Sequence, residues 1–459
     1  MSSNEKTVSV VVPAGVLGAG IRREQVEWGI RQGAVAVAVD AGSTDSGPSC
    51  LATGVSKMSR DAVHRDIKAM MEAATPAGIP ILIGTCGTSG TDIGVDWTRD
   101  IVIDIAREMG VAPKIALLYS EQPQSVILDK IDRGQIKPLS PTESLEPGTV
   151  RECAHIVALM GPEPYIAAMK EGADIILGGR TTDTAVIAAA PLMLAAGAGA
   201  AWHAAKTAEC GGLCTVNPRD GGVLITVGDD YFDVRPLAPE NTVTPETISA
   251  HMLYENSDPF RLFEPGCVLD VTDAVYTQRD ETTVRVTGSR CEPMPYTMKL
   301  EGASVGPFQT LMMIGIEDPS VLKEFDFFLE SMTTKLNEIV RNTFPDLFDY
   351  DLSFRPYGYN AVSGLPRDGY VPSEVGLMMV VTAPTQDLAT RIAKALNPLF
   401  FHFPLRRGIP LPSYAFPFSP AEIERGQVYE FKLNHVMEVE DPMECVRTEY
   451  VTVRSLEEA

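Results

Sequence analysis

An arginine and an aspartate, Arg180 and Asp183, follow an apolar run that is typical of a buried β-strand. Residues 173–184 read Ala-Asp-Ile-Ile-Leu-Gly-Gly-Arg-Thr-Thr-Asp-Thr, so the hydroxyls of Thr181 and Thr182 lie between the two charges. In open α/β sheets, ligands bind outside the carboxyl ends of the strands, where helix N-termini attract anions. The pattern predicts that Arg180 binds a small anionic metabolite. The alternative is a structural ion pair between Arg180 and Asp183.

A second glycine-rich strand end offers hydroxyls and backbone amides to the same kind of ligand. The loop at 84–90 reads Gly-Thr-Cys-Gly-Thr-Ser-Gly, and its three glycines would let backbone amides approach an anion closely. The substrate-binding residues predicted in this loop are Thr85, Cys86, Gly87, Thr88 and Ser89. Cys86 is either a nucleophile, if a helix N-terminus lowers its pKa, or a small buried thiol.

Three more residues have the chemistry of proton transfer. His155 is expected just before a helix, where Glu152 could orient it as a general base, and helix capping or packing is the alternative. Glu209 ends a predicted helix with its carboxylate against the helix dipole, which is unfavourable unless something offsets it. Asp45 lies in a turn of small polar residues, as a ligand group or in an Asx turn. The predicted catalytic residues are His155, Asp183, Glu209 and Asp45.

No cofactor is required by these patterns. The loop at 15–20 follows the first strand but lacks the Gly-x-Gly-x-x-Gly spacing, which favours a tight turn over nicotinamide binding. Cys210 and Cys214 have three residues between them, but no nearby pair of Cys or His completes a four-ligand zinc site. A divalent metal would still be possible, because hard cations prefer carboxylate oxygens. Its candidate ligands are Asp45, Asp92, Asp96 and Asp183.

The elements that must position these residues alternate between strands and helices in the first half of the chain. The expected strands are 8–13, 34–40, 79–84, 114–119 and the run before Gly178; the expected helices are 23–31, 60–73, 97–109, 123–133 and 163–171. This order predicts five or six parallel strands joined by right-handed crossovers. We therefore expect residues 1–225 to form an α/β domain with a doubly wound, mostly parallel sheet that carries the site.

After about residue 196 the pattern changes to shorter, alternating strands. The expected elements are strands at 222–227, 268–276, 282–289 and 296–300, a long helix at 319–344, a strand at 374–382, a helix at 386–397 and a strand at 427–436. Such strands suit an antiparallel or mixed sheet. We expect residues 226–459 to form an α+β domain that could cover the site and make oligomer contacts, and we expect a homo-oligomer.

The composition excludes several classes of protein. The chain has 459 residues, 45% of them hydrophobic, and a formal net charge of -23 without a long basic run, which argues against nucleic-acid binding. No apolar run is long enough to cross a bilayer, and the first residues lack the apolar region of a signal peptide, so we expect a cytoplasmic protein without membrane contact. The eight scattered cysteines are expected to be free thiols.

Five segments together carry a family resemblance. They are 42–48 (Gly-Ser-Thr-Asp-Ser-Gly-Pro), 152–157 (Glu-Cys-Ala-His-Ile-Val), 173–183, 209–211 (Glu-Cys-Gly) and 415–420 (Ala-Phe-Pro-Phe-Ser-Pro). In this order they resemble the acyclic terpene utilisation protein A family. The resemblance implies a role in the breakdown of acyclic terpenes or of other branched carboxylic acids. Family strand ends read more like Gly-Arg-Ala-x-Asp, whereas this chain has Thr181 and Thr182 and keeps Arg180 and Asp183.

Three functions follow from these groups. An arginine that binds a carboxylate, hydroxyl and amide donors that stabilise an enolate, and a nearby base suit proton abstraction next to a carboxylate or a coenzyme A thioester. This would be lyase, hydratase or isomerase chemistry. The second function is hydrolysis of an ester, amide or thioester by Cys86 or an activated water, although no Gly-x-Ser-x-Gly motif is present. The third is a metabolite-binding or partner subunit without catalysis.

Overall fold

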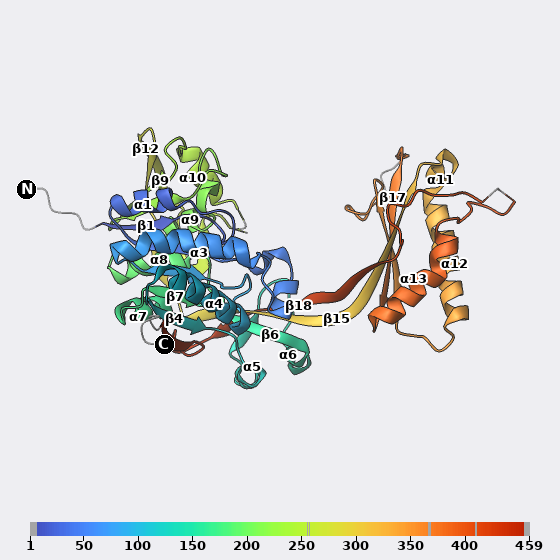
Figure 1. Cartoon of the computed structure of the whole chain (residues 1–459), viewed down its shortest axis with the longest axis horizontal. Helices are drawn as coiled ribbons and strands as arrows, with labels where there is room; N and C mark the ends of the chain where they lie inside the picture. Colours follow the sequence, from blue (N-terminus) through green and yellow to red (C-terminus); the bar gives the residue numbers. More distant parts are fainter. Residues whose placement is uncertain (1–6, 255, 257, 366–368, 409–410, 454–459) are drawn as a thin grey trace, which may run out of the picture. The chain divides into compact units, whose positions relative to one another are not determined.

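The chain folds into two compact units of mixed α/β structure (Figure 1). The structure is a computed structural model that describes residues 7–453 apart from 255, 257, 366–368 and 409–410. One unit comprises residues up to 304 and those from 430 onward, and the other comprises residues 305–429. These limits differ from the expected boundary near residue 225. The reason is that β8 (Val223–Val227) pairs with β1 (Val8–Val12), so the chain stays in the same sheet past that residue.

The larger unit is built on a ten-stranded sheet with a parallel centre. Its strand order is β12-β13-β9-β8-β1-β2-β3-β7-β4-β19, and the strands from β1 to β4 in this order are parallel. The parallel strands after β1 are β2 (Ala34–Asp40), β3 (Ile81–Gly84), β7 (Ile175–Gly178) and β4 (Lys114–Tyr119). The antiparallel strands beyond them are β8, β9 (Tyr231–Pro236), β13 (Thr283–Thr287), β12 (Val275–Asp280) and β19 (Arg447–Thr452). The predicted α/β sheet is confirmed.

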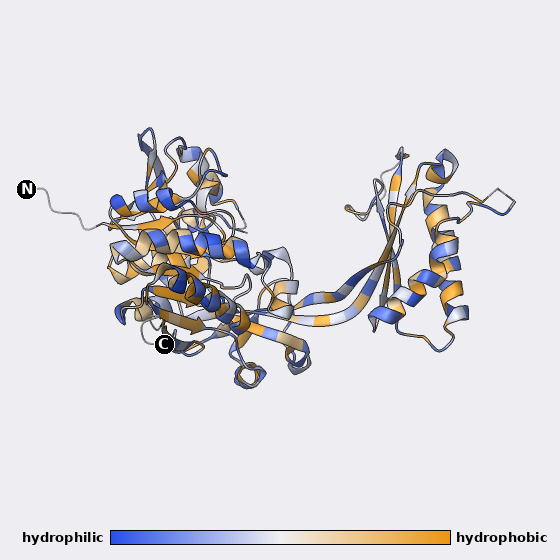
Figure 2. Cartoon of the chain, in the orientation of Figure 1, coloured by the Kyte–Doolittle hydropathy of each residue, from blue (hydrophilic) through white to orange (hydrophobic). Residues whose placement is uncertain are grey.

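Helices cover both faces of this sheet, so its central strands are buried on both sides. In β1, Val10 and Val12 belong to one apolar core and Val11 to the other, as the alternation of a strand requires. Figure 2 shows these central strands as the most hydrophobic part of the unit. One core is closed by α7 (Glu163–Lys170), α8 (Ala185–Met193) and α9 (Ala198–Ala208), and the other by α1 (Arg23–Arg31), α3 (Arg60–Ala74) and α4 (Asp92–Met109).

Shorter elements complete the larger unit. They are α2 (Ser49–Thr53), α5 (Gln124–Asp132), β5 (Ile136–Pro138), α6 (Pro147–Glu152), β6 (Cys153–Ala158), α10 (Pro245–His251), and the three-stranded sheet of β10 (Arg261–Glu264), β11 (Cys267–Asp270) and β14 (Arg290–Pro293). The structure corrects the expected position of His155. It lies within β6, opposite Ala303 of the long strand β15 (Thr297–Ile316), and not in a segment that precedes a helix.

The smaller unit packs three helices against an antiparallel sheet. The sheet contains β16 (Asp351–Tyr357), β17 (Val375–Ala383), β15 (Thr297–Ile316) and β18 (Ile423–Glu438), and the helices are α11 (Pro319–Lys323), α12 (Phe325–Thr343) and α13 (Gln386–Phe400). The single helix expected at 319–344 is interrupted at Glu324, which has φ -120°. No helix among the described residues is long and apolar enough to cross a bilayer.

One apolar stripe attaches α12 to this sheet. Its buried residues recur every three or four positions, which is the spacing of one helix face. They are Phe325, Phe328, Met332, Leu336 and Val340. Since most helix stability comes from such packing, this stripe holds the smaller unit together.

Two neighbouring phenylalanines test this statement. We expect Phe328→Ala to destabilise the protein by about 3–5 kcal/mol, because it leaves a cavity at a position with 0% exposure. The control is Phe327→Ala, at a side chain that is 49% exposed, which should cost about 1 kcal/mol or less. Denaturant unfolding followed by circular dichroism measures both, and equal losses would contradict the packing described here.

Candidate functional site

A cavity of about 690 Å³ opens in the larger unit next to the residues that follow β7. Its polar wall comes from six segments: the residues after β7, the end of α9, β10 with the residues just before it, the first residues of β15, β5 and the end of β18. The charged and hydroxyl side chains that line it are Lys137, Arg180, Thr182, Asp183, Thr184, Lys206, Glu209, Asp258, Arg261, Glu264, Thr297, Lys299 and Glu438. The predicted strand-end site is therefore a cavity, and residues after 225 form part of its lining.

Arg180 is held in this wall by a buried network. Nε donates to Glu301 at 3.0 Å, and Nη1 donates to Asp183 at 3.1 Å and to the hydroxyl of Thr85 at 3.3 Å. Burial would lower the pKa of Arg180, but the charges of Glu301 and Asp183 outweigh it and raise that pKa. The alternative interpretation of Arg180 and Asp183 as an ion pair thus has geometric support. Nη2 has no acceptor among the described residues, so one donor remains for a ligand.

Glu301 is the main counterion of this arginine. Burial raises the pKa of its carboxyl, but Arg180 and Lys299 more than offset this and lower the pKa to about 2. Lys299 donates to the second carboxylate oxygen at 3.1 Å. Asp40, at the end of β2, is also buried close to these charges. Burial, with the charge of Asp183, raises the pKa of Asp40 well above its usual range.

The loop after β3 packs behind Arg180, and part of its backbone is bound to the end of β7. The amides of Thr85 and Cys86 donate to the carbonyls of Gly179 and Gly178, which leaves them no hydrogen for a ligand. A side chain at Gly90 would place its Cβ 2.2 Å from the backbone nitrogen of Arg180, so glycine is required for this close approach. None of the five predicted binding residues of this loop, Thr85, Cys86, Gly87, Thr88 and Ser89, lines the cavity.

The remaining side chains of the loop have structural partners. The Thr88 hydroxyl accepts from the amide of Lys57, and the Ser89 hydroxyl donates to the carbonyl of Cys50. Cys86 has 0% exposure, and burial raises the pKa of its thiol to about 12. Of the two interpretations of Cys86, this environment favours the small buried thiol over the nucleophile.

Thr181 also faces the interior, whereas Thr182 lines the cavity. The Thr181 hydroxyl donates to the carbonyl of Gly179 and lies 2.8 Å from the hydroxyl of Tyr165. Thr182 caps the start of α8 by accepting from the amide of Ala185 at 3.3 Å. Of the two threonines that distinguish this strand end, only Thr182 therefore lines the cavity.

Two buried carboxyl groups in the cavity have raised pKa values. Burial raises the pKa of Glu209 to about 8, although the ammonium group of Lys206, its hydrogen-bond partner, opposes the shift. Burial raises the pKa of Glu264 to about 7, and the Thr184 hydroxyl donates to this carboxyl at 2.7 Å. A carboxyl group with a pKa near 7 can both accept and donate a proton under physiological conditions. The structure thus keeps Glu209 at the site and adds Glu264.

His155 belongs to a different group of side chains. Its Nδ1 lies 2.6 Å from Glu121, whose other oxygen accepts from the amide of Asp92. Glu152, which was expected to orient His155, forms an ion pair with Lys432. The hydrogen bond with Glu121 raises the pKa of His155. His155 does not line the cavity, so the structure does not bring it to Arg180.

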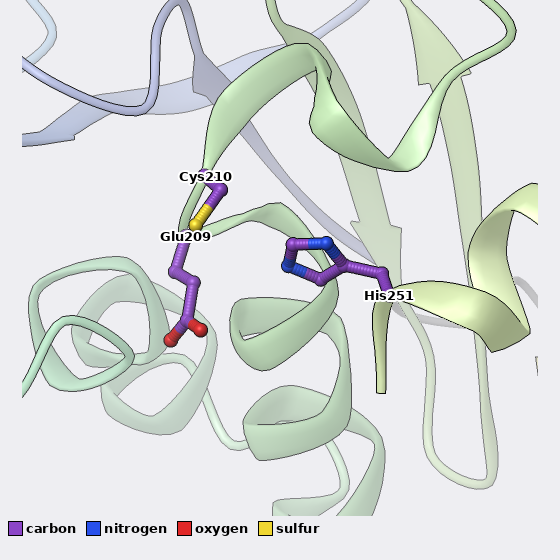
Figure 3. A group of neighbouring side chains, drawn as sticks. All are labelled: Glu209, Cys210 and His251. Carbon is purple, nitrogen blue, oxygen red and sulfur yellow. The ribbon is translucent and has the colours of Figure 1, made fainter. Parts of the chain in front are cut away.

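The four aspartates considered as metal ligands do not converge. Asp45 is exposed and accepts from the hydroxyl of Ser43. The other three form ion pairs: Asp92 with Arg447, Asp96 with Arg99, and Asp183 with Arg180. A different group has suitable chemistry. Glu209, Cys210 and His251 each offer one ligand atom, and these atoms lie within 4.8 Å of one another (Figure 3).

Four residues of the site were not among those predicted from the sequence, and their sequence signals differ. They are Asp40, Lys206, Glu264 and Glu301. Asp40 ends a buried strand, so the rule that identified Arg180 also applied to it. Lys206 precedes Glu209 by three residues on one helix, which is the spacing of an ion pair. In β10, Glu264 shares the buried face with Leu262, and this alternation was a usable signal. Glu301 gave no such signal. It follows the buried Leu300, so strand alternation predicts an exposed side chain, whereas the structure buries both residues.

Comparison with known proteins gives one family. The model of the family described as "Acyclic terpene utilisation family protein AtuA" matches residues 57–215 and 235–412. These stretches include Arg180, Glu209, Glu264 and Glu301. No curated protein and no solved structure matches the chain significantly.

Two glycines with the same backbone conformation test the packing behind Arg180. Gly90 and Gly110 have φ of +67° and +65°, so alanine at either position costs about 1–2 kcal/mol of backbone strain. Only Gly90→Ala adds a clash with Arg180, because no atom lies within 4 Å of a Cβ at Gly110. We expect Gly90→Ala to lower the free energy of unfolding by at least about 2 kcal/mol more than Gly110→Ala. Equal losses in urea unfolding would exclude the tight contact.

The His155–Glu121 pair should make stability depend on pH. Because the folded-state pKa of His155 is raised above 6.5, the pair stabilises the fold fully below pH 6.5, and this contribution is lost as the pH rises through the folded-state pKa. Glu121→Gln should lower the pKa of His155 in an NMR titration, whereas Glu152→Gln should leave it unchanged. A lower pKa in the Glu152 variant alone would contradict this assignment.

Proposed function

The chain belongs to the acyclic terpene utilisation AtuA family, and from this membership and the cavity we propose that it is a catabolic enzyme acting on a branched carboxylic acid or its coenzyme A thioester. The proposed reaction is proton abstraction next to the carboxyl group, as in lyases, hydratases and isomerases. The family name supports a role in acyclic terpene utilisation, whose intermediates are branched compounds. The observation that carries the proposal is the presence of Arg180 and Glu264 in one cavity.

Charge and size support the binding of an acid. Five cationic side chains and five carboxyl groups line the cavity. Burial raises the pKa of Glu264 to about 7, which weakens the negative charge of the lining near neutral pH. A cavity of about 690 Å³ lies in the range of small-molecule sites. Nη2 of Arg180 and the hydroxyl of Thr182 would bind the carboxyl oxygens.

Glu264 is proposed as the group that moves the proton. A carboxylate with a pKa near 7 is a better base than an exposed glutamate, and its protonated form can return the proton at the same pH. The hydrogen bond from Thr184 fixes its orientation. Asp183 is a positioning residue in this proposal, because it holds Nη1 of Arg180.

Hydrolysis by a thiol has less support than proton abstraction. Cys86 is buried outside the cavity lining, and its pKa is raised to about 12, so the thiolate needed for attack would be scarce. Hydrolysis by an activated water and ligand binding without turnover are separate outcomes of the following test.

Hydrogen exchange in deuterated water tests the reaction. Branched acyclic acids and their coenzyme A thioesters are incubated with the protein, and mass spectrometry measures deuterium at the carbon next to the carboxyl group. We expect exchange that falls at least about 100-fold in Glu264→Gln, since general bases contribute that much. Glu281→Gln, at an exposed carboxyl group, is the control. Thioester cleavage without exchange, or ligand-dependent melting without either reaction, would overturn the proposal.

A conservative variant tests whether Arg180 binds the acid. Arg180→Ala would leave Glu301 buried without its main counterion, which costs about 3–5 kcal/mol and could unfold the site. Arg180→Lys keeps the charge but loses the planar set of donors. We expect it to weaken binding of the acid about tenfold or more, as measured by calorimetry. Unchanged affinity would exclude Arg180 as the acid-binding group.

A further inference from the structure

Two segments of the larger unit bring a carboxylate, a thiol and an imidazole together. Glu209 and Cys210 follow directly after α9, and His251 is the last residue of α10. Figure 3 shows the imidazole of His251 and the side chains of Glu209 and Cys210 grouped at the ends of these helices. One ligand atom of each lies within 4.8 Å of the others. In the part of the chain that the structure describes, this is the one such group of three.

The imidazole of His251 is the independent sign that a ligand belongs here. The residue is 5% exposed, and its Nε2 has no hydrogen-bond partner among the described residues. Nε2 is therefore available to present its lone pair to a ligand ion. A buried polar atom without a partner costs free energy, which a bound ion would recover.

A buried imidazole nitrogen that is left as a lone-pair donor is what a metal-binding histidine offers. Ring stacking and core packing, the other common functions of a buried histidine, do not account for this nitrogen. His251 stacks on Tyr254 with ring centroids 5.8 Å apart, which uses the face of the ring and not its nitrogen. Packing alone therefore leaves Nε2 unexplained.

We propose that Glu209, Cys210 and His251 bind one divalent transition-metal ion, of which zinc is the best match. Nitrogen, sulfur and one carboxylate oxygen are ligands for a borderline-soft cation, whereas Mg²⁺ and Ca²⁺ prefer oxygen alone. Three protein ligands leave a fourth position for water or for a ligand, which is the pattern of catalytic zinc sites. Glu209 also lines the cavity, so the ion would lie beside it.

The geometry needs a small closure of the three side chains. Ligand atoms around a tetrahedral zinc ion are about 3.5 Å apart, since each lies about 2.0–2.3 Å from the metal. The longest separation in the group exceeds this spacing by about 1.3 Å at most, because the three ligand atoms lie within 4.8 Å of one another. Such a closure is a matter of side-chain rotation. The two helix ends that carry the residues are held in place by the core that contains Ala208 and Ile248.

Lys206 is the competing cation at this group. Its ammonium group donates to Oε1 of Glu209, which leaves Oε2 for the metal. Without the ion, Lys206 alone neutralises the carboxylate, and with the ion the carboxylate bridges two cations. The proposal therefore predicts that the metal and Lys206 share Glu209, and that Lys206→Met strengthens metal binding.

Cobalt titration of the full-length protein is the direct test. The protein is treated with a chelator, dialysed and titrated with Co²⁺ alone. We expect one equivalent to produce visible d–d bands and a near-ultraviolet sulfur-to-cobalt band, and Zn²⁺ to remove both because it binds more tightly. This readout is independent of the proposed reaction, so either proposal can fail without the other.

Matched variants assign the bands to the three residues. Cys210→Ala should abolish the sulfur-to-cobalt band, and His251→Gln should weaken Co²⁺ binding at least tenfold. Cys214→Ala, at a buried thiol four residues from Cys210, should leave both properties unchanged. Circular dichroism of each variant establishes that it is folded, and His251→Gln remains informative if Cys210→Ala is not. Absence of a cobalt spectrum, a spectrum without the sulfur band, or a sulfur band lost only in Cys214→Ala would overturn the proposal.

Discussion

The burial of one guanidinium group is the constraint on which the site depends. Arg180 is 5% exposed, and a buried charge without a partner would cost several kcal/mol. Glu301 of β15, Asp183 and the hydroxyl of Thr85 compensate this charge from three separate segments. The end of β7, the loop after β3 and the start of β15 therefore have to meet at one point. The cavity lies beside this point, lined by the residues after β7 and by the start of β15.

The same requirement determines how a ligand can enter. Most charges at the cavity have a protein partner: Lys206 with Glu209, Lys299 with Glu301, and Arg180 with Asp183. An incoming carboxylate would add to these pairs or displace one of their acidic members. Such pairs hold the charged groups in fixed positions. These groups would therefore need little reorganisation when charge develops on a bound ligand, which is the condition for electrostatic stabilisation of a transition state. Loss of any one pair would disturb its neighbours as well.

The sequence predicted the elements better than it predicted the site. Strands such as Ala34–Asp40 and helices such as Arg23–Arg31 have the expected limits, because local periodicity and glycine positions decide them. Arg180, Asp183 and Glu209 were identified because they stand at the ends of such elements. Glu301, Glu264 and His251 approach them from distant parts of the chain, and a single sequence carries no record of that pairing. In the loop at 84–90, the close contact of Gly90 with the backbone of Arg180 could not be read from the sequence, because the two residues are ninety positions apart.

The place of β19 in the large sheet has a consequence for synthesis of the protein. This strand, Arg447–Thr452, pairs with β4, Lys114–Tyr119, although more than three hundred residues are translated between them. The sheet that surrounds the cavity therefore cannot be completed while the ribosome is still translating residues 305–429, which form a unit with a core of their own. Until then β4 has an unpaired edge, and such edges promote aggregation. The nascent chain would depend on chaperones at this stage more than a protein whose neighbouring strands follow one another in sequence.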